Sequence, residues 1–277
     1  MTSIIQKVLE AEKRRHAATG SARDRDPERR TFGQVTKEFV AATGLFKRLA
    51  TRVESKAMER NKILPAVDDQ SAVTAYKILR TRVLQRLRSN GWRSLIVTGA
   101  GAGEGKTLTA CNLAVSVSND VNQAVVLVDL DLQRSTVASY FGLDIRASMG
   151  DYLLGHAQID DIVYAPAGLE RLVIVPNREP VPNSSDLLAS PRMRTFLQWL
   201  QEQGPETIVI FDMPPVLACD DVLAFSPYAD AILLVVAEGK TERAALGRTM
   251  ELLGERNLLG VVLNQSREKG SVSPYYY

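Results

Sequence analysis

Residues 98–107 read TGAGAGEGKT, a run of small residues that ends in a lysine and a threonine. The run lies between the apolar segment SLIV and the helix-like segment LTACNLAVSV. Glycines allow backbone N–H groups to approach phosphate oxygens without Cβ clashes, and the N-terminal end of a following helix adds positive potential. Because the loop follows an expected strand and precedes an expected helix, the sequence predicts a phosphate-binding loop for ATP.

The end of this loop carries the groups with the most specific chemistry. Lys106 is expected to reach the β- and γ-phosphates, and the Thr107 hydroxyl is expected to hold Mg²⁺. The first glycine of the usual pattern is replaced by Ala100, which is small enough to be tolerated. A merely flexible glycine loop is the alternative interpretation. The residues expected to contact the nucleotide are Gly101, Ala102, Gly103, Glu104, Gly105, Lys106, Thr107 and Leu108.

Aspartates follow two later apolar runs at the points where strands are expected to end. Asp129 and Asp131 lie in VVLVDLDLQRS, two residues apart and therefore on the same side of an extended chain. Asp212 lies in IVIFDMPP and is expected to be a metal carboxylate. Either Asp129 or Asp131 is expected to orient or deprotonate an attacking hydroxyl. Any one of the three alone could be a helix cap or turn residue, but together they indicate a catalytic set.

The elements that must position these groups alternate between strand-like and helix-like segments. The apolar runs are SLIVTG, AVVLVDLD, RLVIVPN, TIVIFDMP, AILLVVAE and LGVVLNQ. Such continuous apolar strands suit a parallel sheet that is covered on both faces. Residues 71–88 have apolar side chains at helical spacing, and a helix is expected to end at residues 89–91. The predicted fold is a doubly wound α/β domain with a mainly parallel sheet and a phosphate loop.

Composition excludes several other classes of protein. No apolar run is long enough to cross a bilayer, and the first 15 residues contain no secretory apolar region, so a cytoplasmic protein is expected. Cys111 and Cys219 are the only cysteines and are expected to be reduced. His16 and His156 are the only histidines, which leaves little from which to build a zinc site.

Charge divides the chain into two regions. Residues 1–93 contain 21 Lys and Arg against 10 Asp and Glu, a net charge of +11, whereas the remainder contains 13 against 22, a net charge of −9. The basic region is interpreted either as a solvated, helical or disordered extension or as an arm that meets an anionic surface. No nucleic-acid partner is expected, because the arm lacks interleaved aromatic residues and a recognisable DNA-binding motif.

The sequence from about Thr74 to the C-terminus resembles the bacterial tyrosine kinases that govern capsule and exopolysaccharide synthesis. This family belongs to the same group of P-loop ATPases as the cell-division and plasmid-partition ATPases. The matching motifs are GEGKT followed by NLA, VLVDLDLQRS and FDMPP, which are similar to the family's Walker A, A′ and B motifs. SMGDYLLG and VPNSSDLLASPRM are similar to its intervening segments, and Gly101 stands where partition ATPases usually carry an extra lysine.

The resemblance implies an ATP- and Mg²⁺-dependent tyrosine autokinase that acts between subunits. The family's C-terminal tyrosine cluster matches Tyr275, Tyr276 and Tyr277, which are therefore expected autophosphorylation sites. A homo-oligomer is expected at the inner face of the cell membrane, with a separate membrane-embedded polysaccharide chain-length regulator as partner. The expected divisions are a basic extension (1–69), a kinase domain (70–268) and a tyrosine-bearing tail (269–277).

The chain departs from the family pattern at two places. Thr74, Lys77 and Arg80 stand where the family's oligomerisation helix carries Glu-x-x-Arg-x-x-Arg, so the usual acid is missing. Gln133 takes the first basic position of the A′ motif. Two other functions stay open: an ATP-driven dimerisation switch without kinase activity, and a nucleotide-binding scaffold of a membrane polysaccharide complex. Terminal tyrosines favour the kinase.

Overall fold

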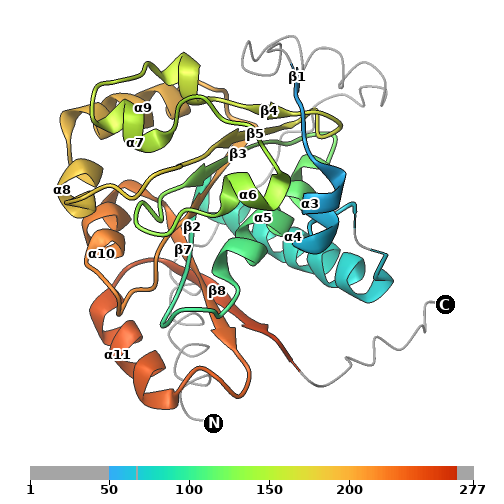
Figure 1. The fold of residues 1–277 in the computed structure, drawn as a ribbon. Coiled ribbons are helices and arrows are strands. Elements are labelled where there is room, and N and C mark those ends of the chain that lie inside the picture. The colour runs from blue at the N-terminus through green and yellow to red at the C-terminus, as the bar shows by residue number, and fades with distance from the viewer. Residues whose placement is uncertain (1–49, 67, 267–277) are drawn as a thin grey trace, which may run out of the picture. The chain divides into compact units, whose positions relative to one another are not determined.

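The computed structural model describes residues 50–66 and 68–266. Their main feature is a six-stranded, all-parallel sheet with the order β5-β3-β6-β2-β7-β8. Its strands are β2 (Ser94–Gly99), β3 (Ala124–Asp129), β5 (Leu172–Val175), β6 (Thr207–Asp212), β7 (Ala231–Ala237) and β8 (Leu258–Asn264). All six correspond to the apolar runs of the sequence, and the predicted α/β fold is confirmed (Figure 1).

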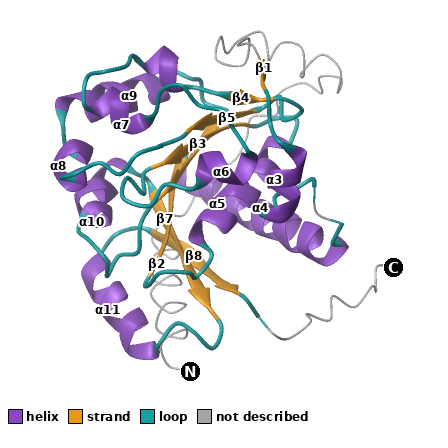
Figure 2. Ribbon diagram, in the orientation of Figure 1, coloured by secondary structure: helices purple, strands orange, loops and turns teal. Residues whose placement is uncertain are grey.

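Helices cover both faces of this sheet (Figure 2). One face packs against α4 (Gln70–Asn90), α5 (Lys106–Ser118) and α6 (Val137–Phe141). The other face packs against α7 (Met149–Leu153), α8 (Ser184–Leu188), α9 (Pro191–Gln201), α10 (Asp221–Phe225) and α11 (Arg243–Leu253). The chain also forms two short 3₁₀ helices: η2 (Ile159–Ile162), which follows α7, and η3 (Ser226–Tyr228), which follows α10. Coverage of both faces explains why the strands are apolar throughout.

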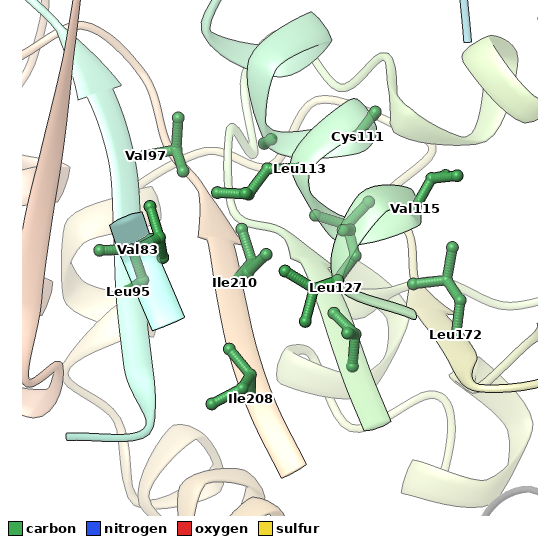
Figure 3. Packing of buried hydrophobic residues seen from close by; sticks show 14 of the residues in the cluster. Val83, Leu95, Val97, Cys111, Leu113, Val115, Leu127, Leu172, Ile208 and Ile210 are labelled. Carbon is green, nitrogen blue, oxygen red and sulfur yellow. The ribbon is translucent and has the colours of Figure 1, made fainter. Parts of the chain in front are cut away.

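Helix α5 lies at the centre of the first of these two cores. Leu113 of α5 points towards Ile210 of β6, whereas Cys111 and Val115 point away from it on the other side of the helix, and all belong to one buried apolar cluster (Figure 3). Nearly every residue of α5 is buried, because strands and neighbouring helices enclose it. This packing holds the first turn of α5 rigidly at the carboxyl end of β2.

Helix α4 forms as the sequence predicts. Asp69 caps its first turn by accepting hydrogen bonds from the backbone N–H groups of Ser71 and Ala72. It ends at Gly91, whose left-handed φ of 69° suits glycine. Val83 and Leu87 are buried, whereas Ile78 is 44% exposed. In the described part of the chain, no helix has the length and apolarity needed to span a bilayer.

The segment before α4 is packed against the domain. β1 (Ala50–Thr51) pairs in parallel with β4 (Ala165–Pro166), and α3 (Ser55–Arg60) contacts α6. The side chains of Met58, Ile63 and Leu64 are buried in the same apolar cluster as α5. The division at residue 69 stays a prediction, but these buried side chains indicate that a truncated domain should begin no later than residue 50.

Candidate nucleotide and phosphoryl-transfer site

The glycine-rich loop runs from the end of β2 to the first turn of α5, as the sequence predicts. Gly103 and Gly105 have φ angles of 71° and 88°, a left-handed conformation that other residues adopt only with strain. A Cβ atom on Gly105 would also collide with the side-chain amide of Asn264. The loop conformation therefore requires glycine at these positions.

Lys106 lies inside this loop and is buried. Its Nζ atom donates a hydrogen bond to the Gly101 carbonyl oxygen at 3.1 Å. Burial lowers the pKa of the Lys106 ammonium, while the carboxylates of Asp212, Glu104 and Asp131 oppose this effect. The ammonium is thus held among loop amides and carboxylates, in a position suited to the negative charge of a polyphosphate.

The three predicted aspartates meet at the carboxyl edge of neighbouring strands. Asp129 ends β3 and Asp212 ends β6, and the two residues are paired in the register of these strands. Asp131 follows two residues after β3, and its charge acts on Lys106 and Asp212. Since parallel strands end at one edge of a sheet, residues distant in sequence converge beside the phosphate loop.

Asp129 is engaged by the backbone of the segment that follows it. Its carboxylate accepts hydrogen bonds from the N–H groups of Asp131, Thr136 and Val137 at 3.1–3.2 Å. Burial, and then the charge of Asp212, raise the pKa of Asp129 well above its ordinary value. With no exposed surface and three backbone donors, Asp129 is suited to shaping the loop that carries Asp131.

Asp131 is the more accessible of the two A′ carboxylates. One of its oxygens accepts a hydrogen bond from the Arg134 N–H at 3.0 Å, and the side chain is only partly buried. Burial raises the pKa of Asp131, while its hydrogen bond to Arg134 and the Lys106 charge oppose the rise. A partly exposed carboxylate beside the lysine could meet an incoming hydroxyl group.

Asp212 has an unusual environment for a buried acid. Neither carboxylate oxygen has a hydrogen-bond partner of ordinary geometry among the described residues. Burial raises the pKa of Asp212 to about 7, although the nearby Thr107 hydroxyl partly opposes the rise. An unpartnered buried carboxylate beside a hydroxyl fits a divalent cation, because Mg²⁺ takes one or two protein oxygens together with phosphate oxygens and water. The predicted Mg²⁺ ligands thus suit the ion chemically.

Comparison with known proteins assigns the chain to a family. Residues 95–273 match the CbiA family, described as the CobQ/CobB/MinD/ParA nucleotide binding domain. The chain is 30% identical over 227 residues to the tyrosine-protein kinase YwqD of Bacillus subtilis, covering 79% of this chain and 92% of YwqD. The chain belongs to the bacterial tyrosine kinases. Within the CbiA group, the resemblance seen in the sequence is thereby confirmed.

Other proteins and solved structures are also similar to this chain in sequence or in fold. The tyrosine-protein kinase Etk of Escherichia coli K12 is 29% identical over 78% of this chain, which matches 30% of the length of Etk. The crystallised kinase domain of E. coli ETK superposes with a TM-score of 0.67 at 28% identity, covering 76% of this chain and 84% of that domain. The chimerical protein CapA2B2 has the same fold, with a TM-score of 0.67 at 22% identity over 83% of this chain and 99% of that chain.

The kinase fold brings further side chains to the phosphate loop that the sequence did not single out. Asn264 and Gln265, at the end of β8, donate hydrogen bonds to the Glu104 and Gly103 carbonyl oxygens, each at 2.9 Å. Lys240 Nζ donates to the same Gly103 oxygen at 3.0 Å. The signal in the sequence is that these polar residues lie at or shortly after the ends of the last two apolar strands.

Two other predicted sites of the kinase do not belong to this loop in the sequence. Thr74, Lys77 and Arg80 lie on α4, where Arg80 Nη1 donates to the Ser116 carbonyl oxygen of α5 at 3.1 Å and Thr74 donates to the Gln70 carbonyl oxygen. Residues 275–277, the expected autophosphorylation sites, fall outside the described residues, as do residues 1–49 of the basic extension.

Proposed function

We propose that this chain is an ATP- and Mg²⁺-dependent tyrosine autokinase. It phosphorylates Tyr275, Tyr276 and Tyr277 of a neighbouring subunit and thereby regulates the polymerisation or export of an exopolysaccharide or capsule. The observation that carries the proposal is the convergence of Lys106, the partly exposed Asp131 and the unpartnered Asp212 beside a phosphate loop. A nucleotide-binding site alone would not need an accessible carboxylate at this position.

The chemistry follows from the environment of each group. Lys106 and the N–H groups of the loop would hold the phosphate oxygens and stabilise charge that develops during transfer. Mg²⁺ held by Thr107, Asp212 and phosphate oxygens would supply further neutralisation of charge. Asp131 would accept the proton of the incoming tyrosine, whose hydroxyl has a pKa of about 10 and is a poor nucleophile until deprotonated. We favour Asp131 over Asp129 as the base because backbone donors occupy Asp129.

The proposed kinase activity also implies an assembly of several subunits with a membrane partner. Transfer between subunits requires a homo-oligomer, and a separate membrane-embedded chain-length regulator would hold it at the inner face of the membrane. The basic extension is the proposed contact, because it contrasts in charge with the acidic remainder of the chain. In this structure Arg80 of α4 contacts α5, so oligomerisation through α4 would require other groups of that helix or a different rotamer of Arg80.

Mass spectrometry of the purified protein after incubation with Mg·ATP tests this proposal. Phosphate should be found on the three terminal tyrosines and should be absent from a Lys106→Met variant, which loses the ammonium but keeps much of the side-chain volume. A Lys56→Met variant, which alters an exposed lysine of α3, is the matched control and should be labelled like the parent. ATP hydrolysis without tyrosine phosphorylation would favour the dimerisation switch instead.

A further inference from the structure

A hydroxyl group outside the phosphate loop binds an acid inside it. Residues 238–242 connect β7 to α11, and within them the Thr241 hydroxyl donates to Glu104 Oε1 at 2.6 Å. The same hydroxyl oxygen accepts a hydrogen bond from the Ala237 N–H at 3.0 Å. The second Glu104 oxygen, Oε2, accepts from the Gly101 N–H at 3.0 Å. Both oxygens of Glu104 are therefore engaged.

A buried acid in this loop requires a physical explanation. Glu104 is only 2% exposed and lies in a loop whose expected ligand is a polyphosphate, which has the same sign of charge. The Glu104 carboxylate is near enough to Lys106 to oppose the lowering of the pKa of that lysine. Yet Lys106 donates to the Gly101 carbonyl oxygen, and the described residues contain no ion pair between Glu104 and Lys106.

The hydrogen bonds of Glu104 keep its carboxylate from pairing with the ammonium of Lys106, although the two opposite charges attract each other. In a partly buried site a carboxylate and an ammonium interact more strongly than in water. Without the hydroxyl partner of its Oε1 atom, the Glu104 carboxylate could turn towards the buried ammonium of Lys106, on which its charge already acts. The ion pair so formed would compete with phosphate oxygens for the ammonium.

We propose that Thr241 is a positioning residue that holds the Glu104 carboxylate away from Lys106, so that the ammonium stays available for the phosphates of the nucleotide. The proposal rests on the assignment of residues 100–107 as the phosphate loop. It assigns a role in nucleotide binding to Thr241, which lies in the loop after β7 and outside the phosphate loop itself.

The backbone of the phosphate loop has other attachments that do not depend on Thr241. Asn264 binds the Glu104 carbonyl oxygen, while Gln265 and Lys240 bind that of Gly103. These contacts should hold the loop in place when the Thr241 hydroxyl is removed. The effect of such a change would then arise mainly from the freed carboxylate rather than from collapse of the loop.

Titration calorimetry with Mg·ADP on the full chain measures the effect. Thr241→Val should weaken the affinity for ADP by roughly tenfold, because the Lys106 ammonium would then be shared between Glu104 and the phosphate oxygens. Thr241→Ser, which keeps the hydroxyl, should stay within about twofold of the parent. Thr195→Val, the same change at an exposed site on α9, is the matched control.

A double-mutant cycle separates this role from a purely structural one. In a Glu104→Gln background no carboxylate can pair with Lys106, so adding Thr241→Val should cost less than about twofold. An equal loss of affinity in both backgrounds, or no loss in either, would overturn the proposal. If Thr241→Val does not fold by circular dichroism, Thr241→Ala completes the same cycle. Failure of the parent itself to bind Mg·ADP would refute the phosphate-loop assignment, and the proposal with it.

Discussion

At the scale of single residues, the aspartates at the sheet edge differ in their surroundings although their sequence contexts look alike. Asp129 is satisfied by three backbone N–H groups, Asp131 is partly exposed, and Asp212 is buried without a hydrogen-bond partner of ordinary geometry in the described part of the chain. An unsatisfied buried carboxylate destabilises a folded protein unless a cation or a proton neutralises it. Asp212 is thus expected to favour nucleotide and metal binding at the expense of the stability of the free protein.

We predict that Asp212→Asn stabilises the protein in metal-free buffer without nucleotide. Burial raises the pKa of Asp212 to about 7 in the folded state, from its ordinary value of 3.8. The folded state therefore binds the proton more tightly, and its stability falls as pH rises from about 4 through 7. At pH 8 the variant should exceed the parent by at most about 4 kcal/mol in free energy of unfolding, because a pKa difference of about three corresponds to roughly that free energy.

Urea unfolding between pH 5 and pH 8 measures this difference, which should shrink as pH falls. Asp144→Asn, at an exposed carboxylate, is the control and should show little change at any pH. A variant that is no more stable than the parent at pH 8 would mean that Asp212 is not charged and unpartnered in the free protein.

At the scale of elements, the short segments before α4 add buried side chains to the apolar cluster around α5. Asn112 of α5 accepts a hydrogen bond from the Leu64 N–H at 2.8 Å and donates one to the Lys62 carbonyl oxygen at 2.9 Å. The side chains of Ile63 and Leu64 lie in the same apolar cluster as α5, which begins at the phosphate loop. Loss of packing in this cluster should therefore displace α5 and weaken nucleotide binding at its first turn.

We predict that two N-terminal truncations will differ in their free energy of unfolding. Removal of residues 1–49 should leave a cooperatively folding domain that binds Mg·ADP, since the described elements are retained. Removal of residues 1–65 also deletes Met58, Ile63 and Leu64, and burial of each such side chain contributes about 1.5–3 kcal/mol. The longer deletion should therefore lose roughly 4 kcal/mol or more in urea unfolding. Equal stability of the two truncated proteins would show that this segment does not contribute to the core.

At the scale of the whole molecule, the proposed reaction joins parts of two chains. The phosphate loop and the aspartates lie at the carboxyl edge of the sheet, where β8 also ends at Asn264. The expected substrate tyrosines follow β8 within the same chain. Each phosphate added there would carry about −1.5 to −2 charges into an acidic region, and repulsion would loosen the assembly.

We predict that transfer occurs between subunits. A Lys106→Met protein with its tail intact is mixed with an active protein in which Tyr275, Tyr276 and Tyr277 are replaced by Phe. Because only the inactive subunit carries terminal tyrosines, phosphate found on its tail by mass spectrometry must come from the other subunit. Labelling of the unmodified protein but not of this mixture would indicate transfer within one chain.

The sequence by itself determined the type of sheet and the identity of the phosphate loop. Both rest on local patterns: continuous apolar runs form strands that are covered on both faces, and glycines are required where φ is left-handed. The strand-end aspartates could be found in the same way, because each directly follows an apolar run. The helix at residues 70–90 likewise follows from its periodicity and from the stop signal that ends in Gly91.

Only the tertiary structure decided how these groups differ and what surrounds them. The strand order places the end of β3 beside that of β6 and brings the ends of β7 and β8 to the phosphate loop, although more than 130 residues separate Thr241 from Glu104 in the chain. Burial and hydrogen bonding depend on such distant neighbours, so no local pattern could distinguish Asp129 from Asp131. For the same reason the contact between Thr241 and Glu104 could not be predicted from the sequence.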